Sequence, residues 1–136
     1  MGTGSDLWNQ LETFYNKQDW AGFASLFASD AVHIDFRGRQ EGREAIVAYF
    51  EEGTKAFPDI KLETLLLLDN EHNVVAEASF RGTHTGSRTL PDGTVVAPTG
   101  KSLEMDAVSV CTIRDGKFAY MRDYCDSADV TRQLSG

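Results

Sequence analysis

The chain has 136 residues and a mass of 15.0 kDa, which is the size of one globular domain, and we expect residues 1–136 to form a single domain. Hydrophobic residues at 41% and charged residues at 25% exclude a disordered chain, a collagen and a disulfide scaffold. A formal net charge of −8 disfavours nucleic acid and anionic membranes as partners. Without a leader-like or membrane-spanning apolar run, we expect a cytoplasmic protein.

Three helices are predicted in the first half of the chain. Apolar residues at helical spacing follow Ser5, a good N-cap, and predict a helix over about 5–17. Asp19 can cap a short second helix. A third helix begins after Gly42 and must end before Pro58, because the residue before a proline is disfavoured in the helical region.

The rest of the chain predicts strands. A short one over 31–36 lies between the second and third helices, and β-rich runs follow at 60–68, 74–84, 103–114 and 117–125. Asp115-Gly116 predicts a two-residue hairpin between the last two. The stretch 85–100 is too long for a plain turn and has the length of a lid or binding loop. This order predicts an α+β fold, a curved antiparallel sheet that wraps around the helices and holds a pocket.

Strand alternation predicts which side chains face that pocket. Ala76, Ala78 and Phe80 alternate with polar residues and are expected inside, with His84 on the same parity. In the expected strand 31–36, His33 and Asp35 share the face opposite the apolar side chains. Each of these polar residues is either a functional group or an ordinary structural one.

The Asp115-Gly116 hairpin also predicts a register. Pairing across it places Val110 opposite Met121 and Val108 opposite Asp123, so Asp123 faces inward if the valines do. The alternate face of the 103–114 strand is then expected to be an exposed homodimer surface, made by Leu103, Met105, Ala107, Cys111 and Ile113.

Two cysteines complete the candidate reactive groups. Cys111 and Cys125 lack metal or redox spacing and are expected to be free thiols. The same register places Cys111 opposite Tyr120, on the other face of the sheet from Cys125 and beyond disulfide reach. Metal ligation and a nucleophile triad both lack a signature, since no His-x-His, His-x-x-x-His or Gly-x-Ser-x-Gly occurs.

Several motifs resemble the SnoaL-like polyketide cyclases, of the nuclear transport factor 2 and ketosteroid isomerase superfamily. They span nearly the whole chain: Leu26-Phe27-Ala28-Ser29-Asp30-Ala31-Val32, Phe57-Pro58-Asp59, Arg81-Gly82-Thr83-His84-Thr85-Gly86, Pro98-Thr99-Gly100-Lys101 and Asp115-Gly116-Lys117. The resemblance implies a cone-shaped sheet with a pocket, and a homodimer. It also implies a pocket carboxylate that acts as acid and base without cofactor or metal.

Two relatives of that superfamily are disfavoured by the residues present. Similarity to ketosteroid isomerase puts Asp35 on the general base, but Val108, Leu11 and Phe50 stand where oxyanion donors are needed. A missing donor of this kind costs about 3 kcal/mol or more. Similarity to limonene epoxide hydrolase puts Asp123 on a catalytic carboxylate and His33 and Asp35 on the positions that hold water, but apolar Ala78 and Phe80 replace the rest of that site.

The resemblance and the residues together lead to one hypothesis. We expect a cofactor-free, metal-free proton-transfer enzyme for a small, mostly apolar carbonyl compound, with Asp123 and Asp35 as acid and base and His33 or His84 as donor. The expected pocket is lined by Leu11, Phe14, Phe50, Ala78, Phe80, Val108, Val110, Met121 and Cys125. The alternatives are a non-catalytic, dimeric ligand-binding module, or a hydrolase or dehydratase that uses Asp123 and His33 on water.

Overall fold

The computed structural model describes residues 3–90 and 92–135. It contains helices α1 (Thr3–Lys17), α2 (Trp20–Ser25), α3 (Arg43–Ala56) and α4 (Ser127–Leu134), and strands β1 (Phe27–Asp35), β2 (Gly38–Glu41), β3 (Lys61–Asp69), β4 (Asn73–Thr83), β5 (Arg88–Thr89), β6 (Val95–Val96), β7 (Ser102–Arg114) and β8 (Lys117–Cys125). No helix in this part of the chain is long and apolar enough to span a membrane.

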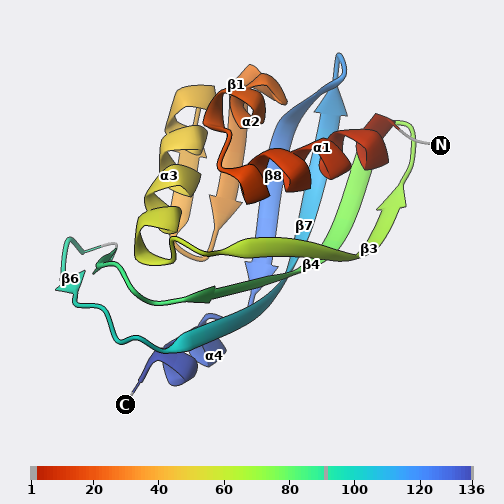
Figure 1. The fold of residues 1–136 in the computed structure, drawn as a ribbon. Helices are drawn as coiled ribbons and strands as arrows, with labels where there is room; N and C mark the ends of the chain where they lie inside the picture. Colours follow the sequence, from red (N-terminus) through yellow and green to blue (C-terminus); the bar gives the residue numbers. More distant parts are fainter. Residues whose placement is uncertain (1–2, 91, 136) are drawn as a thin grey trace.

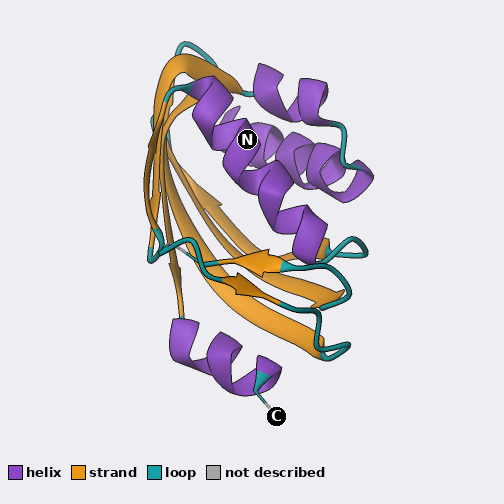
Figure 2. Cartoon of the chain, turned by 90° about the vertical axis from the view of Figure 1, so that its left-hand side faces the viewer, coloured by secondary structure: helices purple, strands orange, loops and turns teal. Residues whose placement is uncertain are grey.

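Six strands form one curved sheet in the order β2-β1-β8-β7-β4-β3, and α1, α2 and α3 cover its concave face (Figures 1 and 2). The predicted α+β class is confirmed. One pair departs from the expected antiparallel sheet, because β1 runs parallel to β8, with Val32 beside Tyr120, His33 beside Met121 and Ile34 beside Arg122.

The three predicted helices form, but α1 begins at Thr3, so Ser5 lies inside the helix and is not its N-cap. The Asp19 side chain accepts a hydrogen bond from the Gly22 amide at 3.0 Å and caps α2, and α3 ends two residues before Pro58. In α1 one stripe is buried, and the Trp8 indole donates to Thr64 Oγ1 on β3 at 2.9 Å. Each large apolar side chain buried against the sheet contributes about 1.5–3 kcal/mol.

Four elements and one register were not expected. β2 pairs with β1, the short strands β5 and β6 pair within the predicted 85–100 loop, and α4 follows the last strand. The predicted hairpin turn holds, with Arg114 opposite Lys117, but a bulge between Thr112 and Ile113 shifts the rest of the β7–β8 pairing by one residue. A one-residue shift turns every side chain to the other face of the sheet.

The face predicted for the β7 side chains is also wrong. Val110 lies opposite Arg122 and Val108 opposite Tyr124, both on the convex face, and Val110 is 37% exposed. The face expected to form a dimer surface is the concave one: Leu103, Ala107 and Cys111 are buried, and Met105 and Ile113 pack against the core.

The two cysteines lie on one face of the sheet, contrary to expectation, but they form no disulfide, as predicted. Cys111 lies opposite Met121 and Cys125 opposite Ala107, so both thiols face the concave side, which corrects the expected opposite faces. Four residues of β7 still separate the two pairing positions, and both cysteines are free, as predicted.

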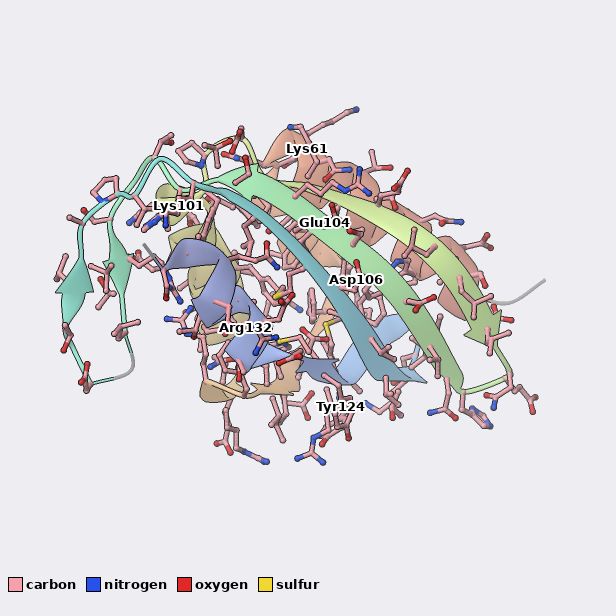
Figure 3. The ribbon with its side chains drawn as sticks, turned by 90° about the horizontal axis from the view of Figure 1, so that it is seen from below. Lys61, Lys101, Glu104, Asp106, Tyr124 and Arg132 are labelled. Carbon is pink, nitrogen blue, oxygen red and sulfur yellow. The ribbon has the colours of Figure 1, made fainter. Side chains whose placement is uncertain are left out.

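The helix α4 closes the lower end of the sheet, where β7 extends past the end of β8 (Figures 2 and 3). Asp126 caps it by accepting from the Asp129 amide at 3.1 Å. The side-chain amide of Gln133 then pairs with the free edge of β7, accepting from the Glu104 amide at 2.8 Å and donating to its carbonyl at 2.7 Å. The backbone N–H and C=O of Glu104 thereby gain the hydrogen bonds that a neighbouring strand would provide.

Candidate active site

A cavity of about 180 Å³ lies between the concave face of the sheet and α3, and it is open on one side. Most of its lining is apolar: Tyr15, Phe36, Phe50, Gly53, Ala56, Phe57, Ile60, Phe80, Leu103, Met105, Ala107, Cys125 and Val130. The remaining lining is polar: Asp35, Arg37, Tyr49, Glu52, Ser87, Arg88, Thr89 and Asp123. An apolar cavity with a few convergent polar groups is the usual form of a small-molecule site.

The parallel pairing of β1 with β8 places the two candidate carboxylates side by side. Asp35 and Asp123 each follow the paired residues Ile34 and Arg122 by one position, and both line the cavity. Adjacent strands lie about 4.8 Å apart, so the two carboxyls stand on one patch of the wall. Within the described chain no hydrogen bond joins them, because each has its own donors.

Asp123 is held by two side chains from neighbouring strands. Its Oδ2 lies 2.8 Å from Nε2 of His33, and its Oδ1 accepts a hydrogen bond from the Ser109 hydroxyl on β7. The His33 ring is 0% exposed, whereas the Asp123 side chain is 21% exposed, so the carboxylate is the member of the pair that reaches the cavity. We call His33 and Asp123 the dyad.

The other ring nitrogen fixes the tautomer of His33. Its Nδ1 lies 2.6 Å from Oε1 of Gln40 on β2, and because an amide oxygen can only accept, Nδ1 carries a proton. Burial lowers the pKa of His33, but the hydrogen bond and charge of Asp123 outweigh it, with smaller contributions from Gln40 and Asp35, and the pKa is raised overall. The protonated imidazole is therefore favoured.

Asp35 makes a second, separate arrangement. Its Oδ1 accepts from the Arg37 amide at 2.8 Å, and its Oδ2 accepts from the Tyr49 hydroxyl on α3. Burial, followed by the hydrogen bond to Asp35, raises the pKa of Tyr49 well above its ordinary value, so the phenol keeps its proton. The Arg37 guanidinium lies 5.5 Å from the centre of the Tyr49 ring.

His84 lies outside the cavity lining. Its ring is fully buried and packs on Phe57 with ring centres 5.3 Å apart, and Nδ1 bonds to the hydroxyl and amide of Thr99 at 3.0 and 3.3 Å. Its backbone bonds to Gly100 and Lys101, so His84 ties together the two ends of the 85–100 loop. Burial, then the charge of Arg88, lowers its pKa, and the ring is neutral at pH 7.

Of the nine expected pocket residues, Phe50, Phe80 and Cys125 line the cavity. Leu11, Ala78 and Met121 are buried in the core. The ring of Phe14 packs against Gly22 of α2, so closely that a Cβ added to Gly22 would lie 2.5 Å from the ring. Val108 and Val110 lie on the convex face of β7, away from the cavity. The Cys125 thiol is held in its protonated form, since burial, followed by the charges of Asp35 and Asp123, raises its pKa.

No three side chains of His, Cys, Asp or Glu within residues 3–90 and 92–135 group closely enough to form a candidate metal site.

A family model of the SnoaL-like polyketide cyclases matches residues 5–134. The chain belongs to this family. Comparison with curated proteins gives no significant match.

Solved structures of similar chains confirm the fold expected for a SnoaL-like protein. AclR from Streptomyces galilaeus, a proposed hydroxylase, is 25% identical, with 96% of this chain and 93% of that chain covered and a TM-score of 0.81. IdmH from Streptomyces antibioticus, a proposed polyketide cyclase, is 24% identical, with 96% of each chain covered and a TM-score of 0.81. A proposed SnoaL-like cyclase from Jannaschia sp. CCS1 is 20% identical, with 98% and 92% covered and a TM-score of 0.86.

The polar residues of this SnoaL-like site that were not found from sequence include Gln40, Tyr49, Arg88 and Ser109. Ser109 was missed because the expected register did not place it opposite Asp123. Gln40 was missed because β2, the strand that places it beside His33, was not expected. The spacing of α3 could have revealed Tyr49, because it neighbours Phe50 on a helix that covers the pocket.

Proposed function

We propose that this protein is a polyketide cyclase-type enzyme in which the dyad transfers a proton to and from a carbonyl substrate in the cavity. One observation carries the proposal: the carboxylate of Asp123 lines an apolar cavity. Hydrogen bonds from the ring of His33 and the hydroxyl of Ser109 hold this carboxylate in place. Acid and base groups act best when they are held in place and their protonation is tuned by neighbours.

The geometry defines how many protons the dyad holds. Because Nδ1 of His33 already donates to Gln40, the 2.8 Å contact between Nε2 and Asp123 needs one further proton. That proton gives either an imidazolium beside a carboxylate or an imidazole beside a carboxylic acid. The raised pKa of His33 favours the first form, in which Asp123 is the base.

The steps balance without a cofactor. Asp123 accepts a proton from the carbon next to a substrate carbonyl, and the resulting enolate attacks a second carbonyl carbon of the same molecule. A carbon–carbon bond forms, and Asp123 returns the proton to the new alkoxide oxygen. His33 retains its charge throughout and stabilises the carboxylate before and after the transfer.

In this scheme Asp35 is a positioning residue, which refines the expected acid and base pair. Both of its oxygens accept hydrogen bonds from within the protein, and its negative charge contributes to the raised pKa of His33. The Tyr49 hydroxyl that Asp35 orients belongs to the cavity wall and keeps its proton.

The test uses a carbon acid that needs no knowledge of the natural substrate. In deuterated buffer, the hydrogens next to the carbonyl of 2-tetralone exchange with solvent, and NMR follows their loss. We expect the protein to accelerate the exchange and Asp123→Asn to reduce that acceleration by about 10²-fold or more. Asp106→Asn, which removes an exposed carboxylate from the convex face, is the matched control and retains it.

Saturable binding of 2-tetralone with no acceleration of exchange would reject the proton-transfer mechanism and support the ligand-binding module instead.

We also propose a homodimer through the outer, convex face of the sheet, as first expected but with other residues, because those assigned to this face lie on the concave side. Two rows of paired residues there carry exposed Leu66 and Tyr124 and exposed Leu68 and Val110. Half-buried Val108 and Val75 lie between them, and each row also holds one charged residue, Glu77 or Arg122. An exposed apolar surface of this kind is rare on a monomer, and a two-fold axis can cover it with its own copy.

A further inference from the structure

Arg88 is the arginine without a partner. It is partly buried, it lines the cavity, and within the described residues its guanidinium makes no ion pair, hydrogen bond or aromatic contact. Each other arginine of the chain has a carboxylate, a carbonyl or an aromatic ring beside it: Arg37, Arg39, Arg43, Arg81, Arg114, Arg122 and Arg132. In a chain with a net charge of −8, an unpaired cation in a cavity is conspicuous.

The segment around Arg88 is held in place on both sides. Before it, the Gly86 amide donates to the Ala56 carbonyl at the end of α3, at 3.0 Å. The approach is so close that a Cβ at Gly86 would lie 1.8 Å from the Lys55 carbonyl oxygen. After it, the Arg37 side chain donates to the Thr89 carbonyl at 2.9 Å. Arg88 is therefore presented by a fixed backbone.

A second cation strengthens the local field. Arg37 also lines the cavity, and burial, followed by the charge of Arg37, lowers the pKa of Arg88 below its ordinary range. Both effects mark an unfavourable position for an unpaired guanidinium, and a bound anion relieves both. The carboxylates that line the cavity are committed elsewhere: Asp35 to Tyr49, Asp123 to His33, and Glu52 to Lys55 at 3.0 Å.

We propose that Arg88, supported by the charge of Arg37, binds a carboxylate of the substrate, so that the enzyme acts on carbonyl compounds that carry a free carboxylate. This substrate class rests on the proposed function, because it assumes that the carbonyl part of the same molecule reaches Asp123. A guanidinium presents a planar fork of N–H donors that matches the two oxygens of a carboxylate. The apolar wall between the charged groups accommodates the carbon frame.

The test compares two probes that differ in charge and share a frame. Isothermal titration calorimetry at pH 7.5 measures 2-naphthoate against its neutral methyl ester. We expect the unmodified protein to bind 2-naphthoate at least tenfold more tightly, since a hydrogen bond to a charged group contributes about 1.5–3 kcal/mol. Arg88→Gln is expected to abolish this preference with little change in affinity for the ester, and Arg88→Lys to retain part of it.

Arg81→Gln is the matched control, because Arg81 is exposed and paired with Glu104 on the convex face. Equal affinity for the two probes, a preference that survives in Arg88→Gln, or an equal loss of both probes in that variant would each overturn the proposal. Asp123→Asn separates the two hypotheses. This variant is expected to keep the preference for 2-naphthoate while losing exchange on 2-tetralone. The binding preference therefore tests the role of Arg88, and the exchange separately tests proton transfer by Asp123.

Discussion

Replacing Asp123 by Asn removes one charge from the dyad and keeps its shape. The asparagine oxygen can still accept from Ser109, and its NH₂ group can donate to Nε2 of a neutral His33. The variant therefore exchanges a charge-assisted hydrogen bond for a neutral one and leaves no buried group unpaired. The difference between these two kinds of bond is about 1 kcal/mol, which corresponds to a melting temperature lower by about 3–5 °C.

This cost depends on pH because it requires a protonated His33. The folded pKa of His33 is raised above that of an unfolded histidine, about 6.5, so the ion pair stabilises the fold fully below pH 6.5. That contribution is lost as the pH rises through the folded pKa. Above it, the carboxylate of Asp123 faces an unprotonated Nε2, whereas asparagine still donates to that nitrogen. The difference in stability then vanishes and reverses in favour of the variant.

Urea denaturation at pH 5.5, 7 and 9, followed by the fluorescence of Trp8 and Trp20, both of which pack in the core, measures this difference directly. Comparing Asp123→Asn with the unmodified protein cancels the contributions of His84 and of the other carboxylates. Asp106→Asn again serves as the control for the loss of a carboxylate. A cost that is constant from pH 5.5 to pH 9, or a variant that is more stable at pH 5.5, would refute the ion pair and with it the proton count assigned to the dyad.

Three further predictions test the loop, the convex face and the thiols. Gly86→Ala should lower the melting temperature by several degrees and weaken binding of 2-naphthoate, because its methyl group would overlap the Lys55 carbonyl. Val110→Glu should convert a dimer to a monomer in sedimentation velocity at micromolar concentration, and a monomeric unmodified protein would contradict the proposed assembly. Two free thiols should titrate in denatured, unreduced protein, and in the folded state Cys125 should react before the buried Cys111.

The order of the main elements could be predicted because each boundary has a local cause. Asp19 caps a helix through its own side chain, Pro58 excludes helical backbone at the residue before it, and Asp115-Gly116 supplies positive φ values for a two-residue turn. These causes act within a few residues of the chain. The exact partners of the resulting strands depend on distant residues and were predicted less well.

The fourth helix illustrates that limit. Its local signals are an Asp126 cap and two apolar residues at a spacing of four, Val130 and Leu134, over only eight residues. A helix of this length is marginal in isolation. It is stabilised by burial of these two side chains and by the pairing of Gln133 with the edge of β7, and a side-chain amide that completes a strand cannot be recognised by spacing.

The inward orientation of Asp123 was predicted from a wrong register. The expected pairing set it opposite Val108 and assumed that the valines face the pocket, whereas the bulge after Thr112 sets it opposite Ser109, and the valines face outward. The error of one residue in register and the error in face cancel, because side chains alternate with a period of two. The Asp115-Gly116 turn alone does not predict the bulge that gives Asp123 this position.

The parallel pairing of β1 with β8 explains why the second candidate carboxylate lies beside Asp123. An antiparallel neighbour would bring the start of one strand to the end of the other and separate the two candidate carboxylates. In the parallel pair, His33 lies beside Met121, and each chain continues two residues further in the same direction to Asp35 and Asp123. His33 of β1 therefore bonds to Asp123 of β8, which lies two residues beyond its own pairing partner Met121. Asp35 lines the cavity beside Asp123. The hydrogen-bonded dyad with a second carboxylate beside it follows from this strand arrangement, which no local pattern in the sequence specifies.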